Sequence, residues 1–180
     1  MKPSIAAAAL LGMTQLLAAC GGEEPATSSS AASPSAALEE IDACALLTAA
    51  EIEEATGIVP AGPDDTGPGS GPPMCSWPAV DDSYPFTVSV LVSFSDNYTS
   101  FDEAMASWQE SAEGMGMEFD TGDYEEVEGP GTVNAWLKEM GMLQAHRGNR
   151  MVQVYARVAP DRDALEASTA LARHAMARLE

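Results

Sequence analysis

The side chains best suited to acid–base and nucleophilic chemistry are scarce in this sequence. It has two histidines, His146 beside an expected hairpin turn and His174 on the expected last helix, and we expect both to be exposed. It contains no G-x-S-x-G, no H-E-x-x-H and no phosphate-binding loop, the motifs that would hold a nucleophile, a zinc ion or a phosphate. We therefore expect a non-catalytic protein without a cofactor, and keep a hydrolase of the cell envelope as an alternative.

The first cysteine, Cys20, follows a segment typical of exported proteins. Lys2 precedes a mainly apolar stretch, residues 5–17, which is too short to span a bilayer as a permanent helix. Small residues then lead into Cys20, as in the lipobox of bacterial lipoproteins. We expect residues 1–19 to be a signal peptide and Cys20 to carry lipid such as palmitate. The alternative is an ordinary signal peptide whose removal leaves a free cysteine.

The lipid would anchor the chain to the outer face of the cell membrane or, in a host with two membranes, make it a periplasm-facing or outer-membrane lipoprotein. The following residues, up to 38, are almost entirely Gly, Ser, Ala, Thr and Pro with two Glu. Such a segment cannot bury enough apolar surface to fold, so residues 20–38 are predicted to be a tether of about 20–25 Å average span. The folded part is then a single domain, residues 39–180.

The two remaining cysteines, Cys44 and Cys75, lie in a chain expected in an oxidising compartment. They can form one disulfide, which should stabilise the fold by roughly 3–4 kcal/mol in the loop-entropy account. Two buried free thiols are the alternative. A metal site is disfavoured because the sequence has no other cysteine nearby and no histidine before His146.

The charge of the chain is strongly negative, with 28 Asp and Glu against 8 Lys and Arg. Neither nucleic acid nor an anionic bilayer surface is expected as a direct partner, because both need basic side chains to neutralise phosphates. A solvated acidic surface is one interpretation of this charge. Calcium binding is the other, and its candidate ligands are Asp120, Asp123 and Glu125, within a cluster that also holds Glu118, Glu126 and Glu128.

Two Met-Gly-Met elements, at residues 115–117 and 140–142, suggest copper binding as a further alternative, because thioethers suit Cu(I). The competing interpretation is that Met115 completes the apolar stripe of a helix, since methionine commonly fills irregular cores.

The elements that must position these residues can be read from periodicity. Thr48-x-x-Glu51 is a capping box and Gly57 a stop signal, which together predict a short helix over residues 49–56. Residues 86–94 alternate with period two, as a strand with one buried face does. Residues 101–115 form a helix with an apolar stripe that includes Trp108, interpreted as core. The last helix, residues 161–179, places its own stripe at Leu165, Thr169, Ala172, Met176 and Leu179.

A hairpin with Gly148-Asn149 as its turn fixes the register of two more strands. Pairing outward from this turn puts Ala145 opposite Val152, Leu143 opposite Val154 and Gly141 opposite Ala156 on one face. The other face then carries Met140, Met142, Tyr155 and Arg157, a candidate contact face for another envelope protein or a small ligand. The same residues would be core if a helix covered them.

Together these elements predict an α+β fold, with a mainly antiparallel sheet of about five strands and helices packed on it, in the order α-β-β-α-β-β-β-α. The residues from Cys44 to Glu51, the Cys75-x-Trp77 element and the Gly129-x-Gly131 turn resemble a family of small actinobacterial lipoproteins with a domain of unknown function. The resemblance implies export, lipidation and a disulfide, and it implies no activity. The expected function is that of a membrane-anchored, non-catalytic binding module.

Overall fold

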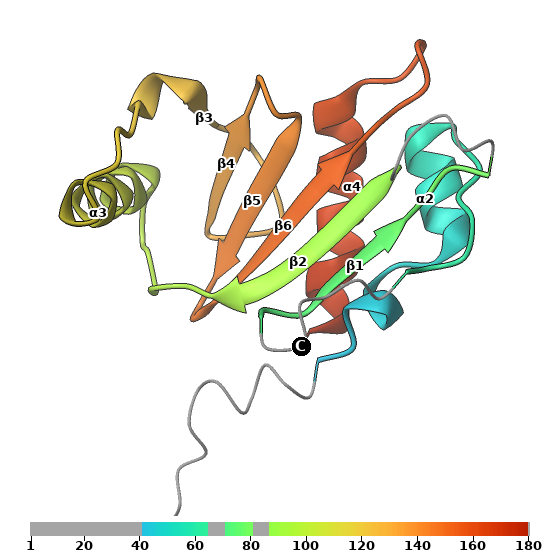
Figure 1. Ribbon diagram of the computed structural model, residues 1–180, viewed down its shortest axis with the longest axis horizontal. Coiled ribbons are helices and arrows are strands. Elements are labelled where there is room, and N and C mark those ends of the chain that lie inside the picture. The colour runs from blue at the N-terminus through green and yellow to red at the C-terminus, as the bar shows by residue number, and fades with distance from the viewer. Residues whose placement is uncertain (1–40, 65–70, 81–86, 180) are drawn as a thin grey trace, which may run out of the picture. The chain divides into compact units, whose positions relative to one another are not determined.

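The computed structural model describes residues 41–64, 71–80 and 87–179. These residues form one six-stranded antiparallel sheet, in the spatial order β1-β2-β6-β5-β4-β3, with helices packed on it (Figure 1). The predicted α+β class is confirmed. In chain order the elements are the 3-10 helix η1 (Ala43–Leu46), α2 (Ala49–Thr56), β1 (Met74–Trp77), β2 (Val88–Phe94), α3 (Phe101–Gly114), the 3-10 helix η2 (Thr121–Asp123), β3 (Tyr124–Glu126), β4 (Val133–Leu137), β5 (Met142–Arg147), β6 (Arg150–Ala156) and α4 (Ala164–Arg178).

The expected signal peptide, Cys20 and the tether lie outside the described residues. None of the helices within the described ranges is long and apolar enough to cross a membrane.

The sheet has one strand more than the five that were predicted. Four strands rather than three follow α3, and the shortest of them is β3, which pairs its three residues with Ala135, Trp136 and Leu137 of β4. Two of its residues are Glu and the run is too short to show an alternating pattern, so periodicity gives no signal there. The observed order is therefore α-β-β-α-β-β-β-β-α. A short, charged strand suits the edge of a sheet, where it discourages pairing with other chains.

The main core lies on one face of the sheet, where α4 packs against β5 and β6 and α2 packs against α4. The alternation predicted for β2 is observed: Val88, Val90 and Val92 are fully buried on this face. The neighbouring strand β6 adds Val152 and Val154 at the same level. These buried side chains supply the apolar area that holds α4 in place.

The buried stripe of α4 is wider than predicted. Ala167, Leu171 and Ala175 belong to it in addition to the expected central residues, whereas Leu165 and Leu179 are only half-buried. The reason is that α4 is covered by the sheet on one side and by α2 on another. A helix covered on two sides must be apolar over more than a single narrow stripe.

The short helix α2 begins and ends where predicted. The Thr48 hydroxyl accepts a hydrogen bond from the backbone N–H of Glu51, and the Glu51 carboxylate accepts one from the backbone N–H of Thr48. At the other end Gly57 has φ 71°, a left-handed conformation that glycine adopts without strain. Both predicted boundary signals are thus confirmed.

The predicted disulfide between Cys44 and Cys75 is present, with a Cα–Cα distance of 5.1 Å. It joins η1 to the edge strand β1, and Cys75 is fully buried in the main core. The bridge therefore fixes the start of the domain to its sheet.

The hairpin turn at Gly148-Asn149 is also observed, and Gly148 has φ 58°. The register of β5 and β6 is the predicted one for Met142 with Tyr155, Leu143 with Val154, and Ala145 with Val152. The predicted pairing was wrong for the next two residues away from the turn. Met140 and Gly141 precede β5 in a turn, where Gly141 has φ 62°, and pair with no residue of β6.

The glycine turn before β4 has a steric cause. A Cβ on Gly131 would lie 2.6 Å from the carbonyl oxygen of His146 and 2.7 Å from its nitrogen. Asn134 fastens the turn, because its side-chain oxygen accepts from the N–H of Gly131 and its amide donates to the Gly131 carbonyl. Gly131 thus allows the start of β4 to lie directly against β5.

Candidate ligand-binding site

The second face of the sheet, opposite the main core, is covered only in part. Strand alternation turns Gln144 of β5 and Gln153 and Met151 of β6 toward this face, and all three are half-buried. The helix α3 lies on this side near β4 and packs there through a small second cluster of Tyr98, Ala104 and Val133. Among the described residues, α3 makes its main contacts with the sheet at β4 rather than at the strands farther from it.

A hollow of about 310 Å³ lies where α3 meets this second face. Most of its wall consists of methionine and aromatic side chains, and the sheet residue Gln144 adds a polar amide group to the wall. We call it the apolar hollow. Its lining residues are Trp108, Ser111, Ala112, Met115, Met117, Phe119, Tyr124, Gln144 and Met151.

The hollow is open because α3 ends early. The helix stops at Gly114, and Gly116 turns the chain with φ 70°. Met115 and Met117 are consequently 66% and 53% exposed, so the prediction that Met115 completes a core stripe was wrong. Both methionines line the same hollow as three aromatic rings, and it is clustered apolar side chains, rather than single exposed ones, that mark contact sites.

An aromatic cluster under the hollow holds Trp108 in place. The Trp108 ring lies 5.1 Å from the His146 ring and 5.5 Å from the Tyr124 ring, measured between centroids. Its indole N–H donates to the hydroxyl of Tyr98, which itself lies edge-on to His146. Trp108 is therefore part of the small second cluster, as its interpretation as core implied, and also a wall of the hollow.

His146 is buried, with 3% of its surface exposed, which contradicts the expectation that it is exposed. The expectation came from its place next to a hairpin turn, and it failed because α3 and Tyr98 fold over that end of β5. Its Nδ1 shares a hydrogen bond with the Ser95 hydroxyl, and its Nε2 has no hydrogen-bond partner among the described residues. Burial lowers the pKa of His146 to about 4, so the ring is neutral at pH 7.

An acidic hollow adjoins the apolar one. It is lined by Gln109, Glu113, Met117, Glu118, Phe119, Asp120, Thr121 and Asp123, so Met117 and Phe119 form a wall common to both. Within the part of the chain that the structure describes, no Lys or Arg lines either hollow. The two hollows together place an apolar surface and a negatively charged surface side by side.

The structure does not assemble the predicted calcium candidates into a site. Asp120 accepts a hydrogen bond from the Gly122 N–H and caps η2, and Glu125 forms an ion pair with Lys138 at 2.6 Å. Within the described ranges no group of three or more His, Cys, Asp or Glu side chains is placed to hold a metal ion. Asp123 lines the acidic hollow, whereas Glu125 does not.

The predicted contact face of Met140, Met142, Tyr155 and Arg157 does not form a single surface. Met142 is buried in the sheet, with 7% exposure, because it lies between Leu137 and Tyr155 on the neighbouring strands. Met140 is 57% exposed in the turn before β5. Tyr155 and Arg157 are half-buried. The exposed methionines of the second face are Met115 and Met117 instead.

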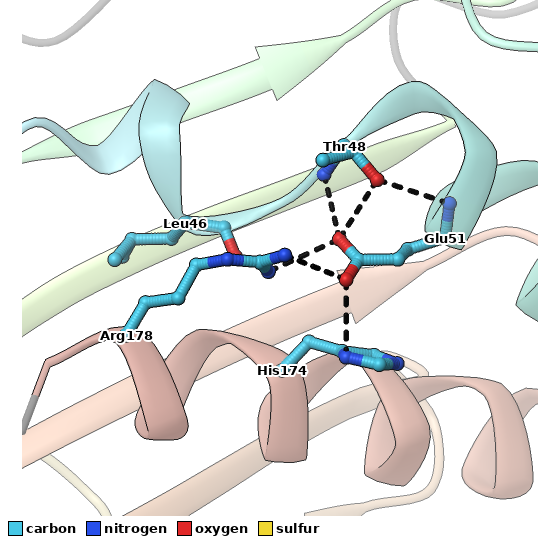
Figure 2. Close-up of polar contacts among 5 residues, drawn as sticks. All are labelled: Leu46, Thr48, Glu51, His174 and Arg178. Carbon is cyan, nitrogen blue, oxygen red and sulfur yellow. Dashed lines mark hydrogen bonds and ion pairs between the residues drawn. The ribbon is translucent and has the colours of Figure 1, made fainter.

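A second cluster of polar residues joins α2 to α4 (Figure 2). Arg178 donates to both carboxylate oxygens of Glu51 and to the carbonyl of Leu46, and His174 Nδ1 lies 3.1 Å from Glu51. These contacts, those from Arg178 above all, lower the pKa of Glu51 to about 2. A carboxylate that stays ionised and fully hydrogen-bonded cannot act as a general acid or base near neutral pH. This cluster is a structural clasp between two helices.

A family model described as a protein of unknown function, DUF3558, matches residues 15–170. No curated protein and no solved structure matches the chain.

Proposed function

The chain belongs to the DUF3558 family of unknown function, and from its own features we propose that it is a membrane-anchored lipoprotein of the cell envelope that binds a ligand in the apolar hollow. It acts as a binding module without catalysis. The ligand is another envelope protein or a small molecule. The observation that carries the proposal is the hollow itself, which gathers exposed methionines and aromatic rings beside an acidic hollow.

The composition of the hollow supports binding. Methionine is flexible and polarisable, so it can adapt its shape to an apolar group, and aromatic side chains are enriched at contact surfaces. Trp108 is held by its neighbours on two sides and offers a preformed wall. A rigid aromatic wall combined with adaptable methionines is a usual design for a contact site.

The surroundings of the two histidines support a role without catalysis. The buried His146 ring has a pKa of about 4 and lies under aromatic rings, and His174 is engaged with Glu51. The Ser95 hydroxyl lies 2.6 Å from His146 Nδ1, but the ring is buried and its Nε2 has no partner among the described residues that could orient it as a base. A hydrolase would need a carboxylic acid free to donate a proton, whereas Glu51, which lines a hollow between α2 and α4 together with His174, is held ionised by Arg178.

The anchor rests on the sequence before the described residues. If Cys20 carries lipid, Cys20→Ala should move the protein from the membrane fraction to the soluble fraction and abolish processing that is sensitive to globomycin. Unchanged retention in the membrane fraction would refute the anchor and leave the binding site untouched.

Photocrosslinking in cells tests the binding function. A photoreactive amino acid at position 117, inside the hollow, should give one specific adduct, and the same probe at position 140 should not give it. Both residues are exposed methionines, at 53% and 57%, so they form a matched pair. Identical adducts from both positions, or none from either, would refute the hollow as the binding site.

Cu(I) binding is a second candidate function, favoured by one observation. Three methionines, Met115, Met117 and Met151, line the same hollow, and thioethers are ligands that Cu(I) prefers. Competition with a chromophoric Cu(I) chelator tests it. The triple variant with Gln at these three positions should lose the copper if the thioethers bind it, and Met140→Gln should keep it.

A further inference from the structure

We propose that the occupant of the apolar hollow is a cationic, amphipathic peptide segment of a partner protein. The segment places one large apolar side chain in the apolar hollow and its Lys or Arg side chains over the acidic hollow. This inference rests on the proposed binding function and names the partner's chemistry.

The size of the apolar hollow favours a side chain over a whole metabolite. Its volume, about 310 Å³, is at the lower end of the range of roughly 300–1,000 Å³ that ligand sites occupy. Two of its walls are methionines more than half exposed, so a bound molecule would continue out of the hollow into solvent. An anchor residue that belongs to a longer chain fits this geometry.

The negative charge beside the apolar hollow indicates that the bound segment is positively charged. Four carboxylates, those of Glu113, Glu118, Asp120 and Asp123, line the neighbouring acidic hollow, and all four residues are exposed. The sequence from residue 87 to residue 137 has no Lys, Arg or His, so no basic residue of this segment offsets them. An anionic lipid or nucleotide would be repelled here, whereas Lys and Arg side chains would be attracted.

The two hollows are close enough to act on one segment, because Met117 and Phe119 line both. A segment that crosses this shared wall would set its apolar residue on one side and its basic residues on the other. A single large apolar residue flanked by basic residues along a short peptide is therefore the pattern that the surface recognises.

Peptide binding to the full chain carrying Cys20→Ala tests the inference without lipid or detergent. The probe is an 11-residue peptide with a neutral fluorophore, Leu at its centre and Lys at every third position. Two matched peptides carry Glu in place of Lys, or Ser in place of the central Leu. Fluorescence anisotropy should show saturable binding of the first peptide, weakened by salt, and no binding of the charge-reversed one.

Two pairs of variants locate the binding. Met117→Gln should weaken the affinity by about tenfold, as loss of a contact residue at a binding centre does, whereas the equally exposed Met140→Gln should not. The double variant Glu118→Gln, Asp123→Asn should weaken binding and reduce its dependence on salt. The matched double variant Asp161→Asn, Glu166→Gln, on exposed positions around the start of α4, should bind as the parent does.

Three results would overturn the inference: no saturable binding of the cationic peptide, equal binding of the charge-reversed peptide, or unchanged binding in the Met117 and acidic variants. A specific crosslink from position 117 to a partner, combined with any of these, would leave the binding function standing and refute only the cationic segment. Failure of the crosslink would refute the binding function itself.

Discussion

Arg178 and Glu51 are 127 residues apart in the sequence and joined by two side-chain hydrogen bonds, of 3.0 and 2.7 Å. Glu51 also closes the capping box of α2, and Arg178 lies in the last turn of α4 (Figure 2). A single carboxylate thus caps one helix and holds the end of another.

Arg178→Ala should lower the free energy of unfolding by about 1–3 kcal/mol, because it removes charge-assisted hydrogen bonds and leaves the Glu51 carboxylate and the Leu46 carbonyl without this donor. Urea denaturation measures the change. Arg173→Ala, on an exposed position of the same helix, is the control and should change little. Equal effects of the two variants would show that the clasp adds nothing to stability.

Stability should fall as the pH is lowered from about 6.5 to about 4. The pKa of His146 is lowered from 6.5 to about 4 by burial, so in this window the unfolded chain binds a proton that the folded chain does not. The loss should be about 2–4 kcal/mol, complete below the folded pKa. Urea denaturation at a series of pH values measures it.

The matched variant for this experiment is His146→Gln, which cannot be protonated in this range. Carboxylates contribute to acid denaturation in both proteins, so the difference between their pH profiles isolates the histidine. Parallel profiles from pH 7 to 4 would contradict the assigned burial of His146.

Replacing both Cys44 and Cys75 by Ala should lower the free energy of unfolding by about 3–4 kcal/mol, since the bridge closes a long loop between η1 and β1. A thiol count on the denatured, unreduced parent should find neither cysteine free. Two reactive thiols in that assay would contradict the bridge.

Gly131→Ala should destabilise the protein by more than 1 kcal/mol, because its methyl group would lie within about 2.7 Å of the His146 backbone, which cannot move aside. Gly62→Ala is the matched control, since a Cβ there meets no atom within 4 Å. Thermal unfolding compares the two. A Gly131→Ala protein as stable as the Gly62→Ala protein would mean that β4 and β5 do not approach this closely.

Local signals in the sequence predicted much of the fold. The capping box at Thr48 and Glu51, the alternation over β2 and the Gly148 turn each depend on neighbouring residues, and each is observed. Strand β3 carried no such signal, because three residues with two Glu show no period. The family resemblance is confirmed only as a domain of unknown function.

The candidate site could not be predicted in the same way, because it is made by tertiary contact. Side chains from residues 108–124 line the apolar hollow together with Gln144 and Met151. The spacing of these residues in the sequence does not predict that they lie together. Met115 continues the apolar period of α3, yet the helix ends one residue before it and leaves it exposed. His146 was misjudged for the same reason, since the helix that buries it comes from a distant segment.

Labelling of single cysteines in living cells tests the central claim, that the apolar hollow is occupied by a ligand. Met117→Cys and Met140→Cys introduce thiols at positions of similar exposure, inside and outside the hollow. In the purified protein both should react with a membrane-impermeant maleimide at similar rates. In cells the thiol at position 117 should be protected and the thiol at position 140 should react; equal labelling of the two in cells would contradict the claim.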